Sequence, residues 1–388
     1  MSQEKKPSQG YHSIKSGNKS LQESSLKNNI LDTEGINTTG LKPGNSNTRK
    51  DVPKHQVKSK ANVTSHLELE KEKSARRKKL LDSLHPGFAV PEGTDFTDIS
   101  LVRLDMERVR FHNNVMQRCK FNSSKLRGVR FKNCDLRGAD FRKADLRDCI
   151  LDGCNLNGAD LRMANLSNAR IIDTDLSASS FDQAVLDEAV IENCDMAAQT
   201  FHQSSCQKLS LFNSHIIHGF FDNTDFSKAE IRDVEFRHCT LTKTFFHDAD
   251  ISSVQFKGCE SVDEGPSFKH TRITQSVFTD CELQSINLTG AHFSQCTWKR
   301  IIMRDAQLDD TTFNQVDFNE SQFTDCYSIE KAPFFSSCRM DHLFIEHTDL
   351  TTAVFRDSVF IGATIKDSDF NEWDLKKTYI DDETIIEQ

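Results

Sequence analysis

The chain has 388 residues, of which 36% are hydrophobic and 28% charged, and its formal net charge at pH 7 is −9. It contains no run of about 18 apolar residues, so the sequence predicts no membrane-spanning helix. Its 12 cysteines accompany no apolar leader at the N-terminus, which disfavours a disulfide framework. We therefore expect a soluble chain that is made in the cytoplasm, without integral membrane insertion.

Residues 1–63 are rich in Ser, Asn, Thr and Lys, and Tyr11 is their only aromatic residue. They hold 11 Lys and Arg against 5 Asp and Glu, a net charge of +6. Such a segment buries too little apolar surface to offset the entropy of ordering, so the composition predicts disorder.

Residues 64–87 have the pattern of a short helix, which the dipeptide Pro86-Gly87 ends. Sparse leucines, among them Leu80, Leu81 and Leu84, offer a narrow apolar side. We predict that this helix caps the first turn of the structure that follows, because the open end of a sheet needs cover. The alternative is a free helix that a partner binds.

From Phe96 onward, a large apolar residue returns at every fifth position. This series occupies residues 96–256, where Cys206 is the smallest member, and then residues 268–323 and 335–385. A period of five matches neither an α-helix nor a β-strand, whereas short fixed repeats are typical of a solenoid.

The period is interrupted twice, and each interruption adds two residues and contains a proline, Pro266 or Pro333. A proline cannot donate a hydrogen bond to a strand ladder. The sequence therefore predicts loops near residues 257–267 and 324–334.

Each five-residue unit has a small residue two positions before its large apolar centre, such as Ala139 or Ala144. Residues two apart on extended backbone point to the same side, so both side chains should face inward. Glycine and asparagine, as in Asn157-Gly158, then suit a turn before the next unit. Nine cysteines occupy the small inward position, which indicates packing rather than reactivity. These are Cys119, Cys134, Cys149, Cys154, Cys194, Cys239, Cys281, Cys296 and Cys338.

The stretch CDLRG ADFRK ADLRD CILDG CNLNG ADLRM ANLSN, residues 134–168, resembles the pentapeptide-repeat family, whose motif is written A(D/N)LXX. The resemblance extends over residues 94–387. It implies an all-β solenoid, a right-handed quadrilateral β-helix with four units in each coil. The 33, 12 and 11 units of the three blocks then make about 14 coils. Residues 199–219 fit the motif least well, which predicts a local distortion or, alternatively, a docking site.

Charge is unevenly distributed along the repeats. Residues 101–150 hold 13 Lys and Arg against 6 Asp and Glu, whereas residues 151–388 hold 19 against 40. In a coil of 20 residues, arginines 20 apart form short ladders that an anionic partner could recognise. The alternative is a charged surface that only keeps the protein soluble. The candidate interaction surface comprises these arginines and two carboxylates of the first predicted loop: Arg110, Arg127, Arg130, Arg142, Arg147, Arg162, Asp263 and Glu264.

The sequence contains no phosphate-binding loop and no HExxH, GxSxG or CxxC motif. His215 and His218 lie three apart, but on a solenoid wall this spacing does not bring them together on one side. We therefore expect no catalytic residues, no metal ligands and no cofactor, and we interpret the chain as non-enzymatic.

Two functional hypotheses follow from the resemblance. The first is a protein-interaction scaffold, a bacterial effector delivered into host cells, because several secreted effectors are pentapeptide-repeat proteins and residues 1–63 resemble a type III secretion signal. The second is an acidic DNA mimic that binds DNA gyrase, similar to the quinolone-resistance members of the family. Both predict a protein partner and no direct binding of nucleic acid. The basic first coils and the long N-terminal segment favour the first.

Overall fold

The computed structural model describes residues 75, 78–79, 81–370 and 378–387. The predicted disordered segment 1–63 lies outside the described residues, as does much of the predicted helix 64–87. Within that helix, Ala75, Lys78, Lys79 and residues 81–83 are helical, and Leu81 and Leu84 pack against the solenoid core. In the part of the chain that the structure describes, no helix is long and apolar enough to cross a bilayer.

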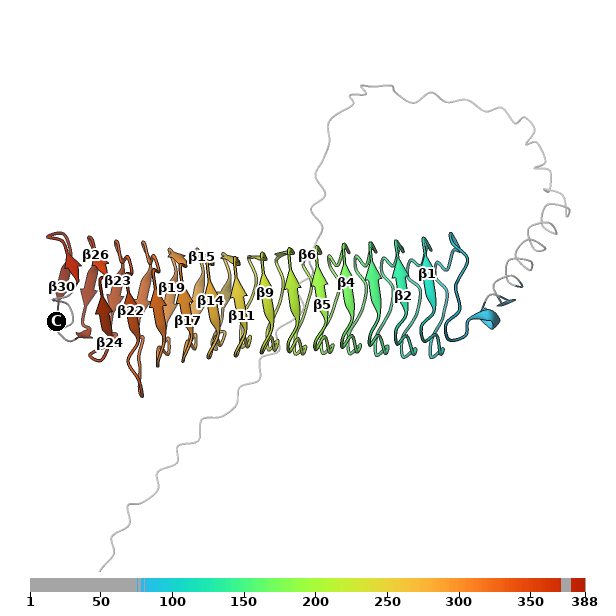
Figure 1. Ribbon diagram of the computed structural model, residues 1–388, viewed down its shortest axis with the longest axis horizontal. Helices are drawn as coiled ribbons and strands as arrows, with labels where there is room; N and C mark the ends of the chain where they lie inside the picture. The colour runs from blue at the N-terminus through green and yellow to red at the C-terminus, as the bar shows by residue number, and fades with distance from the viewer. Residues whose placement is uncertain (1–74, 76–77, 80, 371–377, 388) are drawn as a thin grey trace, which may run out of the picture. The chain divides into compact units, whose positions relative to one another are not determined.

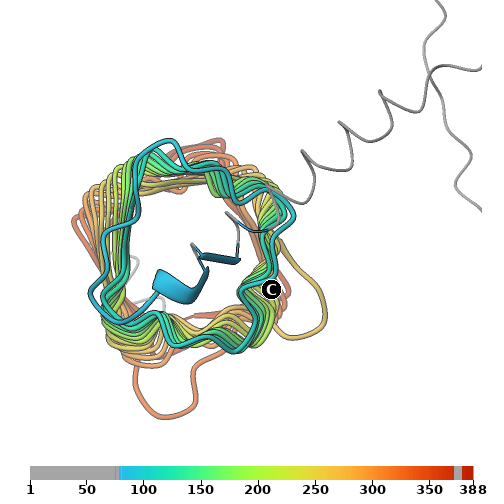
Figure 2. The same ribbon diagram turned by 90° about the vertical axis from the view of Figure 1, so that its right-hand side faces the viewer.

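The repeats form a parallel β-solenoid whose cross-section is a square (Figures 1 and 2). Each coil has four faces, which we number from the first full set of units: face 1 contains Phe111, face 2 Met116, face 3 Phe121 and face 4 Leu126. Face 1 is a sheet of 13 strands, and Ala89 bridges to its first strand from one coil earlier. These 13 strands and the coil of Ala89 make 14 turns, which confirms the predicted solenoid of about 14 coils.

The strands are short, as expected for five-residue units with a turn at each corner. Those of face 1 are, in spatial order, β1 (Arg110–His112), β2 (Arg130–Lys132), β3 (Ile150–Asp152), β4 (Arg170–Ile172), β5 (Val190–Glu192), β7 (Ser210–Phe212), β9 (Glu230–Arg232), β11 (Asp250–Ser252), β14 (Arg272–Thr274), β17 (His292–Ser294), β20 (Thr312–Asn314), β22 (Phe334–Ser336) and β25 (Val354–Arg356).

The other three faces have fewer strands, and isolated bridges replace them in the first coils. Face 2 contains β6 (Asp195–Ala197), β8 (His215–Ile217), β10 (Glu235–Arg237), β12 (Gln255–Lys257), β15 (Val277–Thr279), β18 (Thr297–Lys299), β26 (Val359–Phe360) and β29 (Tyr379–Ile380). Face 3 contains β13 (Glu260–Ser261), β16 (Glu282–Gln284), β19 (Ile302–Arg304), β21 (Gln322–Thr324), β23 (Phe344–Glu346), β27 (Thr364–Lys366) and β30 (Ile385–Glu387). Face 4 contains β24 (Asp349–Leu350) and β28 (Asp369–Phe370).

The five-residue unit explains the square. The centre and the residue two before it are buried in nearly every unit, and the three others face outward. At many corners, the amide of the small inward residue donates to the carbonyl of the preceding centre, as Ala139 does to Leu136 at 3.0 Å. The residue before it takes a positive φ, which is 63° at Gly138 and 58° at Lys143. These are β-turns that need a left-handed third residue, and they turn the chain where the sequence predicted.

Stacked rings fill the interior. Phe121 and Phe141 lie in neighbouring coils with centroids 4.7 Å apart and planes 3° from parallel. Phe246 and Phe268 stack in the same way at 4.8 Å. Offset stacking is a favoured aromatic geometry, so the coil spacing of a parallel ladder suits columns of phenylalanine.

Both interruptions of the period keep the register of the coil. Ser261 and Ser328 stand at unit centres, where a large apolar residue is usual, and Ser261 pairs with Leu283 of the next coil. The projecting loops are residues 262–265, after face 3, and 329–332, after face 4, and Figure 2 shows both leaving the square (yellow and orange). The prolines follow the loops as buried residues of the returning coil. With these centres, Cys259 and Cys326 join the cysteines at the small inward position.

The register also continues through residues 199–219, contrary to the distortion predicted there. Thr200 bridges Phe220 and Ser205 bridges Asp225, each 20 residues on. The unusual residues compensate for one another across coils: Gln199 is large for its inward position, and Gly219 stands beside it in the next coil. A Cβ at Gly219 would lie 2.9 Å from Nε2 of Gln199.

Candidate functional site

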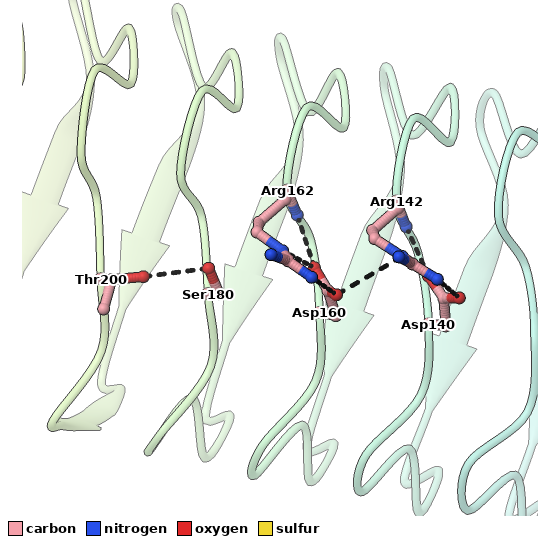
Figure 3. Close-up of polar contacts among 6 residues, drawn as sticks. All are labelled: Asp140, Arg142, Asp160, Arg162, Ser180 and Thr200. Atoms are coloured by element: carbon pink, nitrogen blue, oxygen red, sulfur yellow. Dashed lines mark hydrogen bonds and ion pairs between the residues drawn. The ribbon is translucent and has the colours of Figure 1, made fainter. Parts of the chain in front are cut away.

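The outward side chains of the first coils form pairs of Asp and Arg on the same unit. The aspartate precedes the unit centre and the arginine follows it, so the two lie two residues apart on one side of extended backbone. Figure 3 shows two such pairs on face 3, where Nε of Arg142 donates to Asp140 at 2.9 Å and Nη2 at 2.7 Å. Arg162 makes the same two-pronged contact with Asp160, at 2.9 and 2.6 Å.

Successive pairs on face 3 also touch, because Nε of Arg142 lies 3.5 Å from Oδ2 of Asp160 in the next coil (Figure 3). Arg142 and Arg162 therefore occupy equivalent positions of neighbouring coils, as predicted, but carboxylates alternate with the guanidinium groups along this ladder. Hydrogen bonding to Asp140 raises the pKa of Arg142 above its usual value. The ladder continues as a pair of hydroxyls, Ser180 and Thr200, whose oxygens are 2.9 Å apart.

Asp135 with Arg137 and Asp145 with Arg147 repeat this arrangement on faces 2 and 4. The hydrogen bond from Arg137 lowers the pKa of Asp135 to about 2, against the effect of burial. Bidentate guanidinium–carboxylate contacts engage both ions. These arginines therefore offer a partner little uncompensated charge.

The six predicted arginines thus divide into two groups. Arg142, Arg147 and Arg162 are held by the aspartate two residues earlier, and Nε of Arg127 contacts Asp148 at 2.9 Å. Arg110 and Arg130 are directly paired neighbours on β1 and β2, as the 20-residue coil predicted. Among the described residues, no ion pair involves either of them.

Arg110 and Arg130 line a groove at the corner between faces 4 and 1, with a volume of about 380 Å³. A third arginine, Arg108, also lines this groove, and sequence reasoning missed it because the −3 spacing from Phe111 places it at a turn. A Cβ at Gly128 would lie 3.3 Å from Cγ of Arg108, so the side chain of Arg108 extends over this glycine in the next coil. We call this feature the arginine groove; its lining is Arg108, Arg110, Gly128, Arg130, Asp148 and Ile150.

The two predicted carboxylates of the first loop lie apart from these arginines in the chain and differ in their contacts. Glu264 forms an ion pair with Lys243, whose Nζ lies 2.9 Å from the carboxylate. Asp263 lies at the turn of the loop, where its φ is 63°. Val262, beside them, is 60% exposed. The loop therefore presents an apolar side chain next to acidic ones.

The second loop, residues 329–332, is held by one buried carboxylate. Oδ1 of Asp309 accepts hydrogen bonds from the amides of Ile329 at 2.7 Å and Glu330 at 2.5 Å, and a longer one from Lys331. Burial would raise the pKa of Asp309, but these amide hydrogen bonds and one from Gln307 lower it below its usual value. The carboxylate thus anchors a loop whose first residue, Ile329, is 76% exposed.

Replacing Asp309 with Asn should loosen this loop by about 1 kcal/mol, because neutral acceptors bind amides less strongly than a carboxylate. Trypsin should then cut after Lys331 about fivefold faster. The control is Asp310→Asn, which removes the surface ion pair of Lys331 and leaves the amide bonds intact. Equal rates in the two variants would contradict the anchoring role.

The same carboxylate makes the loop sensitive to acid. Because folding lowers the pKa of Asp309, its stabilisation is present above the pKa of an unfolded carboxyl, about 3.9, and is lost as the pH falls through the lower folded value. The protection factors for hydrogen exchange of the amides at residues 329–331, which are corrected for the intrinsic pH dependence of exchange, should therefore fall below about pH 4 in the wild type and change less in Asp309→Asn.

The cysteines and one cluster of possible metal ligands are the other chemistry-bearing groups of the described residues. All 12 cysteines are buried and none of them forms a disulfide, and burial raises the pKa of Cys149 to about 12. Within the described residues, one group could hold a cation: donor atoms of Glu346, His347 and Asp367 lie within 4.8 Å of one another. His347 is also 3.8 Å from Asp325, so a histidine between carboxylates of neighbouring coils accounts for this cluster.

Two sequence models match parts of the chain: residues 124–201 match a pentapeptide repeat region, and residues 229–260 match pentapeptide repeats in eight copies. Among solved structures, HetL, a pentapeptide repeat protein involved in heterocyst differentiation regulation from the cyanobacterium Nostoc, is 15% identical. The similarity covers 57% of this chain and 87% of HetL, with a TM-score of 0.36.

Full-length QnrB1, a plasmid-mediated fluoroquinolone resistance protein, is 13% identical over 58% of this chain and 93% of its own, with a TM-score of 0.29. The A-module of the mannuronan C-5 epimerase AlgE4 from Azotobacter vinelandii is 9% identical over 79% and 95%, with a TM-score of 0.23. No curated protein matches the chain.

Proposed function

The chain is a pentapeptide-repeat protein, and from this premise we propose that it acts as a non-enzymatic scaffold that binds another protein through its outward side chains. The observation that carries the proposal is the regular division of each unit: two residues fill the interior and three face solvent. Solenoids of this kind offer long surfaces on which binding sites can vary without disturbing the core.

The first coils are the part of this surface that we assign to the partner. They carry the excess of basic residues, and Arg110 and Arg130 are the two predicted arginines without an ion pair among the described residues. The two projecting loops add exposed apolar side chains, Val262 and Ile329. A solvent-exposed apolar residue beside charged ones is a common component of protein interfaces.

We further propose that the protein is a bacterial effector, soluble in the cytoplasm in which it is made and then exported to a host cell. The support is the composition of residues 1–63, which are polar and carry a net charge of +6. The test fuses residues 1–63 to a reporter and measures export in strains with and without a working type III apparatus. Export in neither strain, or equally in both, would remove the effector proposal and leave the scaffold proposal standing.

A second candidate is an acidic binder of DNA gyrase. The excess of carboxylates in residues 151–388, 40 against 19 Lys and Arg, favours it because a negative surface can imitate nucleic-acid phosphates. A supercoiling assay with purified gyrase distinguishes the candidates: inhibition, or protection from a quinolone, would support the DNA mimic, and no effect would remove it.

A further inference from the structure

We infer that the arginine groove binds the phosphoryl group of a phosphorylated serine or threonine on the partner protein. This inference rests on the proposed scaffold function, since it assigns a ligand chemistry to the surface of the first coils. Three arginines, Arg108, Arg110 and Arg130, line one groove of about 380 Å³.

Two of these arginines, Arg110 and Arg130, differ from the paired arginines in the residue across the unit centre. Where an aspartate precedes the centre, as before Arg142, the arginine that follows is neutralised within its own unit. On β1 and β2 the arginine itself precedes the centre, and the residues that follow are His112 and Lys132. No carboxylate therefore stands opposite Arg110 or Arg130 on its unit.

The one carboxylate of the groove, Asp148, is engaged elsewhere, because Nε of Arg127 donates to its Oδ2 at 2.9 Å. Gly128 leaves room for the side chain of Arg108, whose Cγ would lie only 3.3 Å from a Cβ at this position. The groove thus combines three positive charges with one compensated negative charge. A phosphomonoester carries about −1.5 to −2 charges and several acceptor oxygens, and planar guanidinium groups bind it in two-pronged fashion.

The surrounding charges favour a single phosphoryl group over a polyanion. Double-stranded nucleic acid carries one negative charge about every 1.7 Å, so it would extend from the groove along the neighbouring coils. The next positions on face 1 include Asp152 and Asp173, and residues 151–388 have 21 more acidic than basic residues. A phosphorylated side chain places its charge in the groove alone.

The test uses the purified full chain and a short fluorescent peptide that contains one phosphoserine flanked by alanine and glycine. Fluorescence anisotropy at low salt should show saturable binding, and inorganic phosphate should compete. Arg110→Gln and Arg130→Gln should each weaken binding about tenfold, as expected for removal of a charged hydrogen-bonding partner. Circular dichroism and thermal unfolding of each variant confirm that the solenoid is intact.

The matched control is Arg170→Gln. Arg170 occupies the same position of β4 that Arg130 occupies in β2, but it does not line the groove. This substitution should change the affinity for the phosphopeptide less than twofold, because it alters only the overall electrostatic potential of the protein and no contact in the groove.

Three results would overturn the inference: no saturable binding of the phosphopeptide, equal binding of the unphosphorylated or glutamate-substituted peptide, or equal weakening by Arg170→Gln. None of these depends on export, so the scaffold and effector proposals are tested separately. Conversely, a failure of reporter export would not affect the result of the phosphopeptide titration.

Discussion

Replacing Phe256 with Ala should lower the free energy of unfolding by about 3–5 kcal/mol, the usual cost of emptying a large buried aromatic site. The ring is 1% exposed and stacks between Phe236, at 4.9 Å, and Phe278, at 4.6 Å. It also meets Phe246 and Phe268 edge-on. Its loss removes apolar burial and two stacked contacts in neighbouring coils at once.

Urea unfolding, followed by circular dichroism, measures this effect. The control is Phe220→Ala, because Phe220 is 40% exposed and faces outward on face 3. That change should cost less than about 1 kcal/mol. Similar losses in the two variants would show that the central column of phenylalanines is not the core of the solenoid.

Replacing Gln199 with Met should instead stabilise the protein, by about 1–3 kcal/mol. Gln199 is fully buried, and neither Oε1 nor Nε2 has a hydrogen-bond partner. A buried amide without partners costs free energy that an apolar side chain of similar shape avoids. Gly219 already leaves the space that a long side chain needs.

The comparison for this prediction is Gln203→Met. Gln203 lies four residues further along, is exposed and meets Gln183 at 3.3 Å. Its replacement should change the stability by less than about 0.5 kcal/mol. If Gln199→Met destabilises the protein while Gln203→Met does not, the buried amide has a favourable role that its surroundings in the structure do not explain.

Much of the fold could be predicted because every five-residue unit repeats the same pattern of large and small residues. A large residue every five positions and a small one two before it require four short walls, and the 20-residue coil then predicts that Arg110 and Arg130 are neighbours. The bounds of the two loops are harder to predict, because Ser261 and Ser328 occupy unit centres where a large apolar residue is usual. The strand pairing in the structure identifies such a centre, because Ser261 pairs with the apolar centre Leu283 of the next coil.

The candidate site was predictable only in part. Arginines 20 apart suggest ladders, but the structure shows that an aspartate two residues earlier neutralises three of the six predicted arginines. The spacing Asp-x-Arg is visible in the sequence at Asp140, Asp145 and Asp160, so this signal was available. The arginine groove could not be predicted from this spacing, because Arg108 lies at a turn and its side chain extends over Gly128 of the next coil.

The arginines of the first coils divide into paired and unpaired groups, and chemical modification tests this division most directly. Phenylglyoxal reacts with guanidinium groups, and mass spectrometry locates the products on the full chain. Arg108, Arg110 and Arg130 should react first and be protected by the phosphoserine peptide. Arg142, Arg147 and Arg162 should react slowly although their side chains are 44–49% exposed. Equal rates at all six arginines, or no protection by the peptide, would contradict it.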